Sequence, residues 1–189
     1  MSLTTLLGGA RSGKSSLAVE IGRGHLGPVV FVATAPAVDE DIERRIERHR
    51  AERPAVWTTV EEPLDLHGTL LGADDEALVI IDCLTLWVSN LMFAGRSDDQ
   101  VRDGAAAAAA VAAHRDGPVV AVSNEVGMGI HPDTELGRRF RDLLGWVNQT
   151  WATESATSLL LVAGRALELT DPWKHLDGLR PPGPEPRVK

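Results

Sequence analysis

The chain has 189 residues, of which 43% are hydrophobic and 24% charged, and this composition suits one globular domain with a full-sized core. Its formal net charge of −8 argues against a nucleic-acid-binding surface as the main function, and no apolar stretch approaches the ~20 residues that span a bilayer. The single cysteine, Cys83, excludes an intrachain disulfide and favours a reducing compartment, so we expect a cytoplasmic protein without a membrane span.

A phosphate-binding motif lies near the N-terminus. Residues 8–15 read GGARSGKS and fit G-x-x-x-x-G-K-[ST], between a strand-like run at 3–7 and a helix-like run at 16–21. In such a loop the backbone N–H groups face a phosphate, Lys14 reaches the β- and γ-phosphates, and the Ser15 hydroxyl contacts Mg²⁺. The predicted nucleoside triphosphate site therefore comprises Gly8, Gly9, Ala10, Arg11, Ser12, Gly13, Lys14 and Ser15.

A highly charged helix is predicted over residues 39–53, with acids in its first turn and arginines toward its end, and Pro54 ends it. His49 continues the apolar stripe formed by Ile42 and Ile46. The spacing leaves two roles open for this histidine. It either covers the helix end at the surface, or it acts as a nucleophile or proton carrier near phosphate.

Strand-like runs alternate with helical segments, which predicts an α/β protein with a mainly parallel sheet and helices on both faces. The last two runs are separated only by Gly164 and Arg165, which is too short for a parallel crossover, so the final strand should pair antiparallel as a hairpin. The predicted strands cover Leu3–Leu7, Pro28–Ala33, Val56–Val60, Ala77–Asp82, Pro118–Ser123, Ser158–Ala163 and Ala166–Leu169.

Asp82 ends the continuously apolar run 77–81, which is typical of a strand buried on both faces. In phosphate-loop enzymes an acid at this position lies beside the loop and helps to hold Mg²⁺. A solvent-facing acid at a strand end is the alternative. The presence of the loop favours the metal role, with Ser15 and Asp82 as the protein's ligands.

The segment 123–130, SNEVGMGI, follows another apolar strand. Ligands of open α/β sheets bind at the carboxyl ends of strands, so the location suits a binding site. Asn124 and Glu125 form a candidate substrate loop, where they could bind substrate or orient water on Mg²⁺. A structural loop at a subunit contact is equally compatible with the sequence.

Six consecutive alanines at 105–110 predict a helix of high propensity that is exposed or lightly packed. Cys83 is expected to be a small apolar filler. From 171 onward the chain is polar and proline-rich, so we predict one domain over 1–170 and a flexible tail over 171–189. Three tryptophans in helical segments are expected in the core or in an interface: Trp87, Trp146 and Trp151.

Several strings taken together resemble one family. They are GGARSGKS at 8–15, ATA at 33–35, DEDIERRIERHRAERP at 39–54, WTTVEEPLDL at 57–66, DCLTLWVSNL at 82–91, VSNEVGMGIHP at 122–132 and RRFRDLLGWVNQ at 138–149. They occur in the right order over about residues 3–170. The family is the bifunctional adenosylcobinamide kinase / adenosylcobinamide-phosphate guanylyltransferase of cobalamin biosynthesis, CobU or CobP. The resemblance implies a RecA-like phosphate-loop fold and a homotrimer with sites between subunits.

The resemblance also implies two reactions. ATP or GTP phosphorylates the aminopropanol hydroxyl of adenosylcobinamide. A histidine then attacks the α-phosphate of GTP, and the guanylyl group passes to adenosylcobinamide phosphate to give adenosylcobinamide-GDP. The family's guanylylated histidine falls on His49, which with Lys14 forms the catalytic pair. Beyond the phosphate loop, the family's nucleotide contacts fall on Ala33, Thr34, Ala35, Arg50, Ala51, Glu52, Arg53, Glu61 and Asp82.

Two positions depart from the family pattern. Ala156 stands where an acid is common, and His131 where an aliphatic residue is common; we expect His131 to be a solvent-exposed loop residue. Two other functions remain as alternatives to the bifunctional enzyme. A plain phosphate-loop kinase for a small metabolite would use the loop and Asp82 but leave His49 idle, and a nucleotide-dependent switch would perform no small-molecule chemistry.

Overall fold

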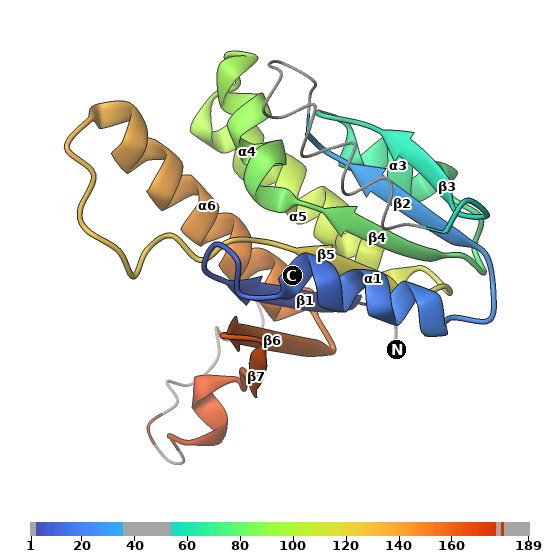
Figure 1. Ribbon diagram of the computed structural model, residues 1–189. Coiled ribbons are helices and arrows are strands. Elements are labelled where there is room, and N and C mark those ends of the chain that lie inside the picture. The colour runs from blue at the N-terminus through green and yellow to red at the C-terminus, as the bar shows by residue number, and fades with distance from the viewer. Residues whose placement is uncertain (1–2, 36–53, 177–178, 180–189) are drawn as a thin grey trace, which may run out of the picture.

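The computed structural model describes residues 3–35, 54–176 and 179. The charged helix predicted over 39–53 and most of the tail predicted over 171–189 lie outside these residues. The described strands form one seven-stranded sheet in the order β3-β2-β4-β5-β1-β6-β7 (Figure 1). Neighbouring strands pair in parallel except β6 and β7, which are antiparallel.

All seven predicted strands are present, with ends that differ by one or two residues. Most of these segments are short apolar runs, and the central ones are buried on both faces of the sheet. Their bounds are β1 Leu3–Gly8, β2 Val29–Ala33, β3 Thr58–Glu61, β4 Leu78–Asp82, β5 Val119–Val122, β6 Thr157–Val162 and β7 Arg165–Glu168.

The β6–β7 hairpin turns one residue earlier than predicted, at Ala163 and Gly164, and Arg165 already belongs to β7. Both turn residues have positive φ, 51° and 73°. Two-residue hairpins favour this geometry because it matches the twist of the flanking strands. Alanine is an unusual residue for the first of these positions. The sequence-based prediction therefore put the turn one residue too late.

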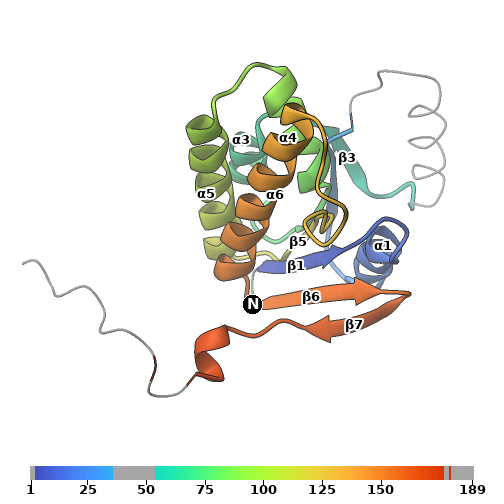
Figure 2. The ribbon, with the colours of Figure 1, turned by 90° about the vertical axis from the view of Figure 1, so that its left-hand side faces the viewer.

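Helices cover both faces of the sheet, as predicted. Figure 2 shows α1 (Lys14–Gly24) on one side and α3 (Leu66–Gly72), α4 (Leu84–Phe93), α5 (Asp98–His114) and α6 (Glu135–Glu154) on the other. In β4, Ile80 belongs to the core cluster on the α1 side, while Val79 and Ile81 belong to the cluster under the other helices. Both clusters exclude water, so burial of apolar surface stabilises the sheet from both sides. None of the helices in the described ranges is long and apolar enough to cross a bilayer.

The alanine-rich helix is not the exposed or lightly packed element that its composition predicted. In α5, the side chains of Ala105, Ala108, Ala109 and Ala112 are all fully buried. Their i, i+3, i+4, i+7 spacing forms one stripe that belongs to the same core cluster as residues of α6. Small side chains let the two helices approach closely, so the run provides a packing face. The remaining alanines are exposed or half-buried.

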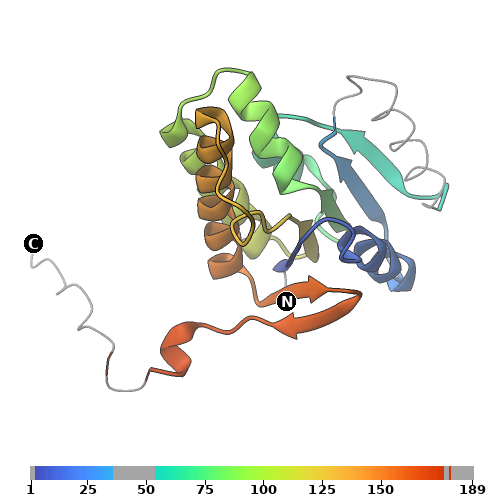
Figure 3. The same cartoon turned by 60° about the vertical axis from the view of Figure 1, so that its left-hand side comes forward.

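The tryptophans lie where they were predicted. Trp87 and Trp151 are buried in the core on the α3–α6 side. Trp146 is half-buried, and the guanidinium of Arg102 lies 5.6 Å from its ring centroid, which places a cation over the aromatic face. The hairpin β6–β7 extends beyond the helices, and the short 3₁₀ helix η1 (Pro172–Lys174) follows it (Figure 3).

Candidate active site

One edge of the sheet collects most of the residues that the sequence predicted for the site. The strands β1 to β6 run parallel, so their carboxyl ends lie together at this edge. His49 and residues 50–53 lie outside the described part of the chain. The edge carries the phosphate loop after β1, Ala33–Ala35 at the end of β2, Glu61 at the end of β3, Asp82 at the end of β4, and Asn124 and Glu125 after β5.

The two predicted metal ligands meet in the structure. The Ser15 hydroxyl, in the first turn of α1, donates a hydrogen bond to Oδ1 of Asp82 at 3.3 Å. Mg²⁺ in phosphate-transferring enzymes is held by one or two hard oxygen ligands of the protein, with phosphate oxygens and water completing the shell. This hydroxyl and carboxylate fit that requirement. The described ranges contain no cluster of three or more His, Cys, Asp or Glu side chains that could hold a metal by themselves.

Lys14 is turned into its own loop. The side chain is buried, and its ammonium donates to the carbonyl oxygens of Gly8 at 2.8 Å and Gly9 at 2.7 Å, and to Oγ of Ser12 at 3.3 Å. Burial lowers the pKa of Lys14, and the nearby Cys83 and Asp82 oppose that shift. The three hydrogen bonds to Gly8, Gly9 and Ser12 use all three hydrogens of the ammonium group. Contact with β- and γ-phosphates requires Lys14 to exchange some of these acceptors for phosphate oxygens.

The β6–β7 hairpin supports the phosphate loop, a contact that the sequence did not predict. The N–H of Gly164, in the hairpin turn, donates to the carbonyl of Ser12 at 3.0 Å. Gly8, at the end of β1, pairs with Leu161 of β6 and has φ of 148°. A Cβ atom at Gly8 would overlap the carbonyl oxygen of Leu161. Only glycine fits here, because it combines this backbone conformation with so close an approach.

Thr34, one of the predicted nucleotide contacts, has its polar groups engaged within the protein. Its hydroxyl donates to the carbonyl of Cys83 at 2.7 Å and accepts from the N–H of Cys83 at 2.8 Å. Its backbone N–H donates to the carbonyl of Asp82, and its carbonyl accepts from the side chain of Asn90 at 2.7 Å. In this structure Thr34 joins β2 to the end of β4 and to α4. It thereby fixes the position of Asp82.

Cys83 precedes α4 and packs against the core cluster on the α1 side, as expected for a small apolar filler. Burial, together with the neighbouring Asp82 carboxylate, raises the pKa of its thiol to about 11. The thiolate is the nucleophilic form of cysteine. Cys83 is therefore held in its unreactive form beside the site.

We expect native Cys83 to react with iodoacetamide about a hundredfold more slowly at about pH 8 than the unfolded chain does, because so little of it is thiolate. The measurement is the rate of mass increase with and without denaturant. Since the chain has a single cysteine, the adduct reports this residue alone. Equal rates in the two conditions would contradict the raised pKa.

Two buried polar residues that the sequence did not single out hold the end of β5. Asn148 of α6 is 4% exposed; its Oδ1 accepts from the Ser123 hydroxyl at 2.6 Å, and its Nδ2 donates to the carbonyl of Asn124 at 3.0 Å. Thr85 of α4 accepts the N–H of Asn124 at 2.7 Å. Asn148 follows Leu144 by four residues and precedes Trp151 by three. A polar residue on such an apolar stripe is the signal that could have revealed it.

The rest of the 123–130 segment reaches solvent. The N–H of Gly127 donates to Oε1 of Glu125 at 2.6 Å, and the apolar side chains of Met128 and Ile130 are exposed. His131 is exposed, as predicted, and its Nδ1 accepts from the guanidinium of Arg141 at 2.6 Å. The base of the segment meets the phosphate loop, where the N–H of Glu125 donates to the carbonyl of Gly8, and residues 127–130 at its tip are exposed.

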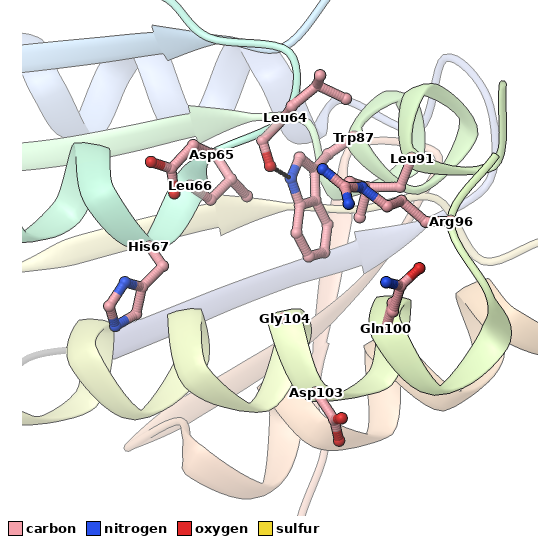
Figure 4. Close-up of a pocket in the computed structure, with 10 residues that line it drawn as sticks. All are labelled: Leu64, Asp65, Leu66, His67, Trp87, Leu91, Arg96, Gln100, Asp103 and Gly104. Atoms are coloured by element: carbon pink, nitrogen blue, oxygen red, sulfur yellow. Dashed lines mark hydrogen bonds between the residues drawn. The ribbon is translucent and has the colours of Figure 1, made fainter. Parts of the chain in front are cut away.

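A separate pocket of about 280 Å³ lies between the start of α3, α4 and α5 (Figure 4). Its wall includes Trp87, whose indole N–H donates to the carbonyl of Leu64 at 2.8 Å. None of the residues that line it belongs to the predicted site. The carboxyl edge of the sheet is the candidate active site, because the phosphate loop, Asp82 and most of the other predicted residues lie there.

Comparison with known proteins settles the family. Residues 4–169 match the sequence model of a family described as cobinamide kinase / cobinamide phosphate guanyltransferase. The chain belongs to this family. Two relatives support the assignment, with 42% identity to the bifunctional adenosylcobalamin biosynthesis protein CobP of Pseudomonas aeruginosa and 40% to CobU of Salmonella typhimurium. The alignments cover 87% and 86% of this chain, and 95% and 96% of the relatives.

The fold is also found in proteins of distant sequence. The assembled ATPase EscN of the enteropathogenic Escherichia coli type III secretion system superposes with a TM-score of 0.52 and 14% identity, over 86% of this chain and 43% of that one. A likeness at this identity concerns the fold alone. It agrees with the RecA-like phosphate-loop architecture predicted for this cobinamide kinase / cobinamide phosphate guanyltransferase family member.

Proposed function

We propose that the protein phosphorylates the aminopropanol hydroxyl of adenosylcobinamide with ATP or GTP, and then transfers GMP from GTP to the product. The second reaction passes through a guanylyl group on His49 and yields adenosylcobinamide-GDP. Membership of the family over residues 4–169 carries the proposal. It is supported by a phosphate loop whose Ser15 hydroxyl already meets Asp82.

The proposed nucleotide site runs along the carboxyl edge of the sheet. The phosphates lie at the loop 8–15, and Mg²⁺ held by Ser15 and Asp82 would neutralise part of their charge. Glu61 ends β3, four strand positions from β1. At ~4.8 Å per strand this is about 19 Å. A nucleotide lying along this edge could therefore meet the loop at one end and Glu61 toward the other.

The residues of this chain divide the chemistry between them. Loop N–H groups and the N-terminus of α1 bind phosphate oxygens. Lys14, once it exchanges its carbonyl acceptors for phosphate oxygens, stabilises charge that develops on phosphorus. The neutral imidazole of His49 attacks the α-phosphorus and pyrophosphate leaves, which divides the guanylyl transfer into two displacements. The arginines of the 50–53 segment would stabilise the phosphate charge there.

The same resemblance supports a cytoplasmic homotrimer with sites at the subunit contacts. The proposed substrates are adenosylcobinamide and its phosphate. Their reacting ends, the aminopropanol hydroxyl or its phosphate, would meet the carboxyl edge of the sheet beside the candidate substrate loop at Asn124 and Glu125. The exposed Met128 and Ile130 lie on the same segment, and they suit either an apolar substrate surface or a neighbouring subunit.

Incubation with GTP and Mg²⁺ tests the guanylyl step. We expect the intact mass to rise by about 345 Da, in an acid-labile phosphoramidate linkage, and His49→Ala to show no adduct while it still phosphorylates adenosylcobinamide. His131→Ala, which removes an exposed histidine elsewhere in the chain, is the control and should form the adduct normally.

Absence of the adduct from the wild type, or its persistence in His49→Ala, would refute the covalent role. Phosphorylation without any adduct would indicate the plain phosphate-loop kinase instead.

A further inference from the structure

Glu125 follows β5, the strand that lies between β4 and β1 in the sheet. β4 ends at Asp82, the predicted metal ligand, and β1 leads into the phosphate loop. Val122, the last residue of β5, pairs with Asp82 of β4 on one side and with Leu6 of β1 on the other. The backbone N–H of Glu125 donates to the carbonyl of Gly8 at 3.0 Å. Glu125 is therefore bonded directly to the first residue of the phosphate loop.

The backbone that carries Glu125 is fixed from both sides. The buried amide of Asn148 and the buried hydroxyl of Thr85 hold the carbonyl and the N–H of the preceding residue, Asn124. Both side chains come from helices packed in the core, α6 and α4. A group that must meet a substrate atom in one geometry benefits from a support of this kind.

The carboxylate of Glu125 is available for chemistry. It is half-buried, and its Oε1 accepts the N–H of Gly127 at 2.6 Å. Oε2 has no hydrogen-bond partner within the part of the chain that the structure describes. The other acids at this edge are placed differently, since Asp82 meets Ser15, and Glu61 ends a strand that three others separate from β1.

We propose that Glu125 is the general base of the kinase half-reaction. This inference rests on the proposed function. The substrate hydroxyl oxygen bonds to the γ-phosphorus, the bond from that phosphorus to the β,γ-bridging oxygen breaks, and the nucleoside diphosphate leaves with the bridging oxygen. The hydroxyl proton passes to the Glu125 carboxylate and then to solvent.

The guanylyl half-reaction has no need of this base. Its first nucleophile is a neutral imidazole nitrogen, and its second is a phosphate oxygen that already carries negative charge. Neither displacement has to remove a hydroxyl proton. Of the two reactions that share the phosphate loop, only phosphate transfer should therefore depend on Glu125.

The test is Glu125→Gln, which keeps the size and one acceptor oxygen of the side chain but removes its basicity. We expect kcat for phosphate transfer from ATP to adenosylcobinamide to fall by about 10²–10⁴-fold, with KM for ATP unchanged. The guanylyl adduct formed with GTP and Mg²⁺ should appear at the wild-type rate.

Glu135→Gln is the matched control, because Glu135 is an exposed acid in the first turn of α6. It should retain both activities. A Glu125→Gln protein that keeps phosphate transfer, or that loses the adduct as well, would overturn the inference. Failure of the proposed function has a different signature, since the wild type itself would then lack the adduct or the phosphate transfer.

Discussion

Lys14→Met is expected to reduce phosphate transfer from ATP by at least about 10²–10³-fold and to suppress guanylyl adduct formation with GTP. Removal of one preorganised donor to a developing oxyanion costs this much in other enzymes. In this chain the ammonium also organises the loop, through the carbonyls of Gly8 and Gly9 and the hydroxyl of Ser12. Steady-state kinetics and intact-mass measurement report the two reactions separately.

Lys174→Met provides the matched control for this change. Lys174 lies in the exposed helix η1, away from the carboxyl edge of the sheet, and its loss should alter neither reaction. Because phosphate transfer and guanylyl transfer share the loop, we expect Lys14→Met to impair both. A variant that loses only one of them would mean that Lys14 contacts phosphate in only one reaction.

Gly8→Ala is expected to lower the free energy of unfolding by about 2–5 kcal/mol and to prevent ATP binding. Two costs add: a backbone conformation that alanine rarely adopts, and a methyl group forced against a backbone carbonyl. The carbonyl belongs to Leu161 of β6. To relieve the overlap, either β6 must move away from β1 or the loop must shift. Urea denaturation and ATP titration measure the two effects.

Gly9→Ala separates this clash from a general effect of alanine in the loop. A Cβ at Gly9 meets no atom within 4 Å, so we expect a change in unfolding free energy of less than about 1 kcal/mol. If the two adjacent substitutions cost the same, the close approach of β6 would not be the reason for glycine at position 8.

Local patterns predicted the sheet and the loop well. The apolar run 77–81 followed by Asp82 is a strand, and the glycine-rich motif at 8–15 joins a strand to a helix, because each depends on residues adjacent in sequence. The alanine helix shows the limit of this reasoning. Composition gives high helix propensity at 105–110, but the positions of the neighbouring helices decide that one alanine face is buried.

The contacts between distant segments could not be predicted in the same way. The bond from Gly164 to Ser12 joins residues 152 positions apart in sequence, and nothing near either residue specifies the other. The role of Asn148 depends on how α6 lies over the end of β5. His49 illustrates the opposite case, since its proposed role comes from a resemblance and its position lies outside the described residues.

The position of β1 in the sheet has a consequence for synthesis of the chain. β1 is made first, yet its two neighbours are β5 and β6, so Thr4 pairs with Val120 and Thr157. Pairings so distant in sequence form slowly, because a long loop must close before they contribute. On the ribosome, β1 and the phosphate loop that follows it cannot complete their strand pairing until β6 has been synthesised. A nascent chain stalled before β6 would carry the complete phosphate-binding motif and lack one of the two strands that hold it.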